Sequence, residues 1–184
     1  PLDNFDQVMR FLELVSDPAG LNLSHRHISL STCGVVDRIR ELAQREMQIT
    51  LSISLHATDD GARSAIMPVN NRWKIGELLD ACREYTERTH RRISYEYALI
   101  SGVNDSRRQA EELAALLKGM LCHVNLIPVN YVKEAGYGKS PKERVYAFQK
   151  VLTDRGINAT VRRTLGADID AACGQLRREA ERPD

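Results

Sequence analysis

The chain alternates short β-branched segments with amphipathic segments of helical period, and this alternation constrains the fold more than any other feature. Apolar positions with the spacing of one helix face follow each of the first four expected strands. The expected strands span residues 27–31, 49–55, 92–100, 123–127 and 158–164. Repeated strand–helix units form parallel sheets, so the expected fold class is α/β. A closed eight-unit barrel requires about 250 residues, so we expect a partial barrel or an open sheet.

Two segments carry local sequence signals for turns and for the start of a helix. Residues 58–71 are polar and rich in turn residues, and Pro68 excludes a helix that runs through the whole segment. Residues 140–143 have the pattern of a capping box, with Ser140 as the cap and Pro141 at the first helical position.

The charge of the chain is balanced, with 26 basic and 25 acidic residues, so any nucleic-acid footprint must be local. Basic pairs such as Arg107–Arg108 and Arg162–Arg163 fit either a solvated face or such a footprint. No apolar run has the length of a membrane helix, and no signal peptide is recognised. The four cysteines lie far apart, without zinc-ligand spacing or a disulfide framework, which favours a reducing, cytoplasmic setting.

Polar residues gather where the expected strands end. In parallel β/α folds the ligand lies at the carboxyl ends of the strands. The residues within or just after these strands include Ser31, Ser54, Leu55, His56, Glu96 and Asn130. Singly, each has an ordinary structural explanation. Ser31 and Ser54 could hydrogen-bond to backbone groups near turns, His56 could be a hydrogen-bonded structural residue, and Glu96 could pair with an arginine on a neighbouring strand. Together they predict a site for a small polar ligand with hydroxyls and amines, such as a nucleoside.

One thiol, Cys173, lies among small residues in the stretch 166–176. Free cysteines often behave as small buried hydrophobes, which is the ordinary explanation for this one. The alternative is a functional thiol, which its small neighbours leave accessible to a reaction partner.

Six motifs occur in this order along the chain: Ser-Thr-Cys-Gly-Val-Val at 31–36, Ser-Leu-His-Ala at 54–57, Glu-Tyr at 96–97, Val-Asn-Asp at 103–105, Asn-Leu-Ile-Pro at 125–128 and Ala-Cys-Gly-Gln-Leu at 172–176. Together they resemble the radical S-adenosylmethionine RNA methyltransferases. They are most similar to the enzymes that methylate C2 of an adenine in 23S ribosomal RNA and in certain transfer RNAs. The resemblance covers essentially the whole chain, and Pro1-Leu2 resemble the end of the family's Gly-Glu-Pro-Leu motif.

The resemblance implies a partial (βα)6 TIM-like barrel of the radical SAM type. Residues 1–184 would be the C-terminal portion of its catalytic domain, holding only the later β/α units. S-adenosylmethionine would be contacted by residues matching Ser31, the run Ser54, Leu55 and His56, and Asn130. The cysteine matching Cys173 would be the methyl carrier, because an adenine C2–H is neither acidic nor nucleophilic and a thiolate is a competent methyl acceptor. The implied partners are a [4Fe–4S] cluster, an electron donor, 23S rRNA and tRNA in the cytoplasm, with no membrane.

The sequence also departs from the family pattern. The Cys-x3-Cys-x2-Cys cluster motif and the Gly-Glu that binds the methionine amino group are absent. We therefore expect the cluster ligands to lie outside this chain and the chain alone to be inactive. Two alternatives stay open: a related enzyme that methylates C8 of adenine, and a non-catalytic domain that binds RNA or a protein partner.

Overall fold

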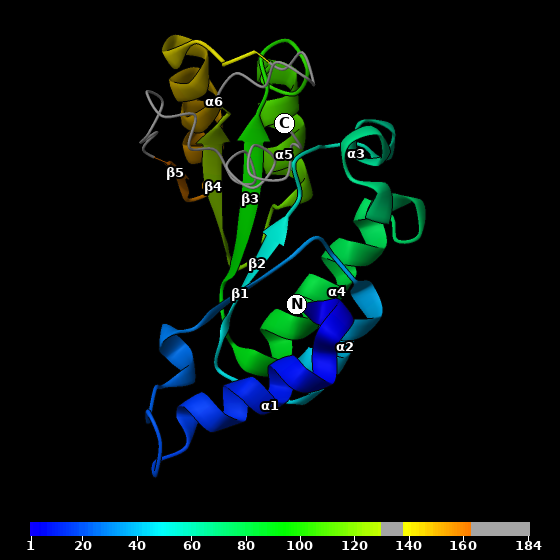
Figure 1. Cartoon of the computed structure of the whole chain (residues 1–184). Coiled ribbons are helices and arrows are strands. Elements are labelled where there is room, and N and C mark those ends of the chain that lie inside the picture. Colours follow the sequence, from blue (N-terminus) through cyan, green and yellow to red (C-terminus); the bar gives the residue numbers. More distant parts are fainter. Residues whose placement is uncertain (130–137, 163–184) are drawn as a thin grey trace, which may run out of the picture.

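A computed structural model describes residues 1–129 and 138–162, so two predicted site residues, Asn130 and Cys173, lie outside the described residues. Helices and strands alternate along the chain (Figure 1). The helices are α1 (Phe5–Ser16), α2 (Val36–Gln44), α3 (Asp60–Ile66), α4 (Ile75–Thr89), α5 (Arg107–Leu116) and α6 (Lys142–Asp154). The strands are β1 (Ser29–Thr32), β2 (Thr50–Ser54), β3 (Ile93–Leu99), β4 (Cys122–Pro128) and β5 (Ala159–Val161). Within the described ranges, no helix has the length and apolarity needed to span a bilayer.

The strands form one parallel sheet in the order β1-β2-β3-β4-β5. This sequential order is that of β/α barrels, whereas a doubly wound sheet reverses its order at a switch point. Right-handed crossovers in a sequential sheet place the intervening helices on the same face. The α/β prediction of parallel strand–helix units is therefore confirmed.

The two faces of the sheet differ in polarity. In β3, residues 93, 95, 97 and 99 are buried, whereas residues 94, 96 and 98 are half-buried. The buried set packs with apolar side chains of the helices, among them Leu79 of α4, Leu113 of α5 and Phe148 of α6. The Tyr97 ring lies 5.3 Å from the Phe148 ring, centroid to centroid. Because side chains alternate along a strand, the other face stays free of these helices.

Residues 58–71, which the sequence marks as turn-rich, contain the short helix α3 before Pro68. Asp59 caps α3 there, its side chain accepting a hydrogen bond from the Ala62 N–H at 2.8 Å. Pro68 still limits the helix, since α3 ends before it and a short 3-10 helix, Pro68–Asn71, begins at it. Seven helical residues give too short a periodic pattern to stand out in a polar sequence.

The expected capping box at the start of α6 was wrong. The helix begins at Lys142, and Pro141 occupies the cap position without a side-chain cap. The Ser140 hydroxyl instead donates to the Asp105 carboxylate, Oγ to Oδ2, at 2.8 Å. Both residues are buried, and a carboxylate is a strong acceptor for a hydroxyl, so this contact holds the Ser140 side chain at Asp105.

Candidate functional site

The sheet face opposite the helices carries a continuous polar surface, which we call the polar face. Parallel register brings its residues into rows across the strands. One row holds Ser31, Ser52, Ser94 and His123. The next row toward the carboxyl ends holds Ser54, Glu96, Asn125 and Thr160. Hydroxyls, a carboxylate, an amide and an imidazole thus share one surface, as the predicted site requires.

Glu96 lies within the polar face and is held by neutral donors. Its Oε1 accepts from the Ser94 hydroxyl at 3.1 Å, and its Oε2 accepts from the Asn125 amide at 2.7 Å. Among the described residues, no ion pair includes Glu96. The arginine partner considered as its ordinary explanation is therefore not found there, and the carboxylate keeps capacity for a ligand's donors.

Ser31 and Ser54 lie near the carboxyl ends of neighbouring strands. Ser31 is exposed on β1, and Ser54 is the half-buried last residue of β2. Leu55 follows Ser54 and is fully buried; its backbone N–H donates to the Glu96 carbonyl, and its carbonyl accepts from Arg63. The structure thus brings these three predicted residues to one edge, where their cofactor role remains a prediction.

His56 is fixed in an unusual backbone conformation beside β3. Its φ of 61° is left-handed, a region few non-glycine residues adopt. Its Nδ1 accepts from the Ala98 N–H at 3.0 Å, so in the neutral ring Nε2 carries the proton. Burial, with a smaller contribution from the Arg63 charge, lowers the pKa of His56 to about 4. The imidazole is therefore neutral at physiological pH and is a fixed N–H donor through Nε2.

We expect the stability of the protein to fall between pH 6.5 and pH 4 because of His56. The folded-state pKa of about 4 lies below the ordinary value of 6.5, so the unfolded chain binds the extra proton in this window. The loss reaches up to about 3 kcal/mol at the acid end of the window and is absent above pH 6.5. Urea unfolding at pH 7 and pH 4.5 measures it. His56→Asn is the control, because asparagine tolerates the left-handed backbone and does not titrate. An equal pH dependence in wild type and variant would contradict the assignment.

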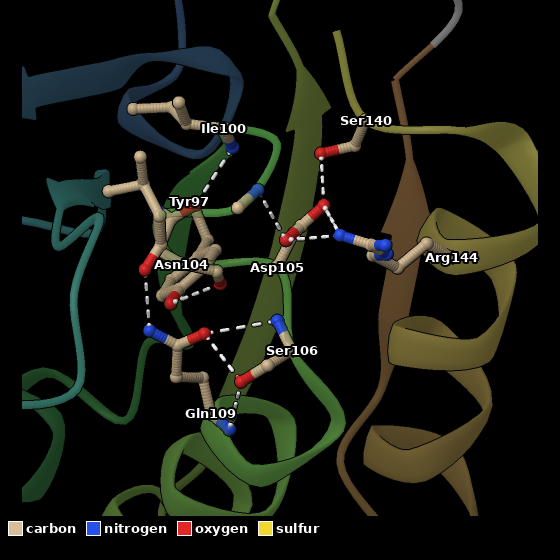
Figure 2. Close-up of polar contacts among 10 residues, drawn as sticks. Tyr97, Ile100, Asn104, Asp105, Ser106, Gln109, Ser140 and Arg144 are labelled. Carbon is tan, nitrogen blue, oxygen red and sulfur yellow. Dashed lines mark hydrogen bonds and ion pairs between the residues drawn. The ribbon is translucent and has the colours of Figure 1, made fainter. Parts of the chain in front are cut away.

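Asn104 holds His56 against β3. It is buried, and its side-chain amide donates to the His56 carbonyl at 2.8 Å and to the Ala98 carbonyl at 2.7 Å. Its Oδ1 accepts from the Ile100 N–H at 2.7 Å, and its backbone carbonyl accepts from the Tyr97 hydroxyl at 3.0 Å (Figure 2). All the hydrogen-bonding positions of the Asn104 side chain except one acceptor site are thus used to join the β2 and β3 ends.

The neighbouring Asp105 extends this network to α6. Its carboxylate accepts from the Gly102 N–H at 3.0 Å, the Ser140 hydroxyl at 2.8 Å and the Arg144 guanidinium at 3.1 Å (Figure 2). Only 2% of the Asp105 side chain is exposed, against 48% of Arg144. Asn104 and Asp105, the two buried residues of the Val-Asn-Asp motif, therefore fix the carboxyl edge of the sheet.

Arg63 is the site-forming residue that sequence reasoning missed. It lies on α3 and is fully buried. Its Nη2 donates to the Cys33 carbonyl at 2.7 Å and the Ser54 carbonyl at 3.1 Å, and its Nε donates to the Leu55 carbonyl at 3.1 Å. One guanidinium thus joins the chain leaving β1 to the chain leaving β2. The capping signal at Asp59 could have revealed α3, but nothing in the sequence marks this arginine as buried.

The described cysteines do not form a ligand set. Cys82 is buried on α4, and burial raises the pKa of its thiol to about 12. Cys122 is half-buried at the start of β4, and burial raises the pKa of its thiol to about 11. Within residues 1–129 and 138–162, no group of histidine, cysteine or carboxylate side chains could hold a metal ion.

One of the basic pairs, Arg107–Arg108, has its charges partly neutralised. Arg107 and Arg108 on α5 pair with Glu111 and Glu112, one helical turn onward. This pair of arginines is the solvated helix face considered above.

Several known proteins are similar to this chain, although no family model matches it. A probable dual-specificity RNA methyltransferase RlmN of Clostridium perfringens is 59% identical over 178 residues, which are 97% of this chain and 51% of that protein. A protein of the same name from Desulforamulus reducens is 56% identical over 181 residues, 98% of this chain and 52% of that protein. The chain therefore spans about half the length of the curated relatives it matches.

Solved structures agree with the observed fold. A radical SAM methyltransferase from Sphaerobacter thermophilus matches with a TM-score of 0.90 and 48% identity, covering 95% of this chain and 51% of that one. A domain of pyruvate-formate lyase-activating enzyme from Bacteroides vulgatus matches with a TM-score of 0.68 at 20% identity, covering 89% of this chain and 94% of that one, which supports the fold alone. The chain is 56–59% identical to part of these RlmN proteins along nearly its whole length and 48% identical to part of the radical SAM methyltransferase, so it is homologous to a part of these proteins.

Proposed function

We propose that these 184 residues are the C-terminal portion of the catalytic domain of an RNA methyltransferase. Its reaction is methylation of C2 of an adenine in 23S rRNA and in tRNA. The observation that carries the proposal is the identity of 52–59% to RlmN proteins along the stretch that builds the polar face. The names of these relatives do not favour the C8 alternative or the non-catalytic binding domain.

The polar face fits a nucleoside-containing cofactor such as S-adenosylmethionine. Ser31 and Ser54 offer hydroxyls, Glu96 accepts hydrogen bonds, and His56 donates through Nε2. A ribose and an amino-acid group need this mixture of donors and acceptors. We propose that Ser31, the Ser54–Leu55–His56 run and Asn130 contact this cofactor, which supplies the methyl group and, when cleaved, the radical that activates it.

The described residues do not fit an iron–sulfur cluster, because they contain no convergent ligand set. We propose that the ligands of a [4Fe–4S] cluster belong to the part of the full-length protein outside this chain, together with the surface that meets an electron donor. The role of Cys173 is to accept a methyl group on its thiolate and to present it to the RNA base, since thiolates are strong nucleophiles.

We expect the full-length protein, purified and reconstituted without oxygen, to produce 2-methyladenosine in a 23S rRNA fragment and in tRNA. Nuclease digestion and mass spectrometry with 2-methyl and 8-methyl standards identify the methylated carbon. The 184-residue chain, assayed in parallel, should produce no methylated nucleoside. Formation of 8-methyladenosine would correct the position, and absence of any RNA methylation by a protein with an intact cluster would overturn the proposal.

A further inference from the structure

A groove of about 710 Å³ lies between α6 and the ends of β4 and β5, and we call it the α6 groove. Pro128 and Val161, the last residues of these two strands, line it. It therefore opens at the carboxyl edge of the sheet, the edge that also holds Ser54 and His56. The described residues that line it are Pro128, Lys139, Ser140, Lys142, Val145, Tyr146, Gln149, Thr160, Val161 and Arg162.

The charged residues in this lining are all basic. Lys139, Lys142 and Arg162 are exposed, and no described lining residue is acidic. The chain as a whole is balanced, so this local excess of three positive charges is a property of the groove. Such a concentration of cationic side chains favours a polyanion.

An exposed aromatic ring accompanies the charges. Tyr146 follows Lys142 by one helical turn on α6, and 59% of it is exposed. Val145 and Gln149 complete the stripe of α6 that lines the groove. A basic groove with an accessible aromatic ring is the usual arrangement for binding single-stranded nucleic acid, because every base can stack on the ring.

We propose that the α6 groove binds the substrate RNA, with Lys139, Lys142 and Arg162 at its phosphates and Tyr146 stacked on an unpaired base. This inference rests on the proposed RNA methyltransferase function and adds a location to it. RNA held in the groove would pass along the carboxyl edge of the sheet, beside the residues proposed to hold the cofactor. An acidic protein would satisfy the charges but would gain nothing from base stacking at Tyr146.

The test compares two triple variants of the full-length protein with the same loss of charge. The groove variant carries Lys139→Gln, Lys142→Gln and Arg162→Gln. The control carries Arg45→Gln, Arg88→Gln and Lys118→Gln, three exposed residues after α2, near the end of α4 and after α5, at the amino edge of the sheet. Binding of a substrate RNA hairpin is measured from 50 to 200 mM salt.

We expect the groove variant to lower the slope of log affinity against log salt by about two to three, close to one for each lost phosphate contact. Affinity at low salt should fall by tenfold or more, whereas the control should resemble wild type. Tyr146→Ala should weaken binding by about tenfold and Tyr146→Phe should not, because phenylalanine keeps the ring. Bound S-adenosylmethionine and the thermal midpoint should be unchanged in every variant, which confirms folding.

The outcomes separate the groove from the proposed function. If wild type binds and methylates RNA while the groove variant keeps its affinity and salt slope, the groove inference is wrong and the function stands. If wild type neither binds nor methylates RNA, the groove inference and the proposed function are both wrong. The groove variant could also bind RNA normally but require a higher concentration of its protein electron donor for methylation. That result would mean that the groove binds an acidic protein partner, and it would also overturn the inference.

Discussion

Replacement of Cys173 by alanine in the full-length protein should lower RNA methylation by at least about a thousandfold. The proposed reaction passes the methyl group through this thiolate, and alanine has no atom that can accept it. The cofactor contacts proposed for Ser31, Ser54 and His56 do not involve the thiol, so S-adenosylmethionine should still bind. Methylation is measured from labelled S-adenosylmethionine into RNA, and binding by equilibrium dialysis.

Cys122→Ala is the matched control for this experiment. Cys122 is half-buried on β4, and a pKa raised to about 11 keeps its thiol protonated and unreactive near neutral pH. We expect this variant to retain activity. In wild-type protein, a tryptic peptide should carry one additional methyl group on Cys173. Full activity of the Cys173 variant, or the methyl group on another cysteine, would contradict the assigned carrier.

The fold could be predicted from periodicity because apolar side chains are buried in the core, so their spacing along the chain indicates the helix or strand that carries them. Phe5, Met9, Leu12 and Val15 follow the helical spacing in the sequence, and all four are buried on α1. Strand boundaries were less certain, since β1 begins two residues later than expected, after the short 3-10 helix His25–His27. Hydrogen bonding at strand ends depends on neighbouring strands, which a local pattern does not contain.

The candidate site could be predicted only in outline. The sheet register that places Ser54 beside Glu96 and Asn125 follows from the parallel topology, so a polar edge was expected. The hydrogen-bond partners of individual polar side chains could not be predicted, because the sequence offers several possible partners for Ser140 and for Glu96. Long-range contacts such as Ser140 to Asp105 decide between them.

Arg63 shows the same limit most clearly, and its replacement by alanine should have the largest effect on stability. The guanidinium donates to three backbone carbonyls and, through Nη1 at 3.0 Å, to the Asn70 side chain. Burial is the main cause of the lowered pKa of Arg63, and the Asp60 charge partly offsets it. Alanine would leave buried acceptors without donors, each at a cost of about 1–3 kcal/mol. We therefore expect the free energy of unfolding to fall by about 3–5 kcal/mol.

The reference for this measurement is Arg72→Ala, in the same part of the chain. Arg72 is exposed, pairs with the exposed Asp37 at 3.5 Å and lies over the Trp73 ring, so its removal should cost at most about 1 kcal/mol. Arg63→Lys should resemble alanine more than wild type, because a single ammonium cannot reproduce the planar fork that reaches the Cys33, Ser54 and Leu55 carbonyls together. Urea unfolding at pH 7 gives the three free energies.

Since these carbonyls flank the proposed cofactor residues, the Arg63 variants that still fold should also bind S-adenosylmethionine more weakly. Equal stability of the Arg63 and Arg72 variants would mean that the β1 and β2 ends hold their geometry without the guanidinium.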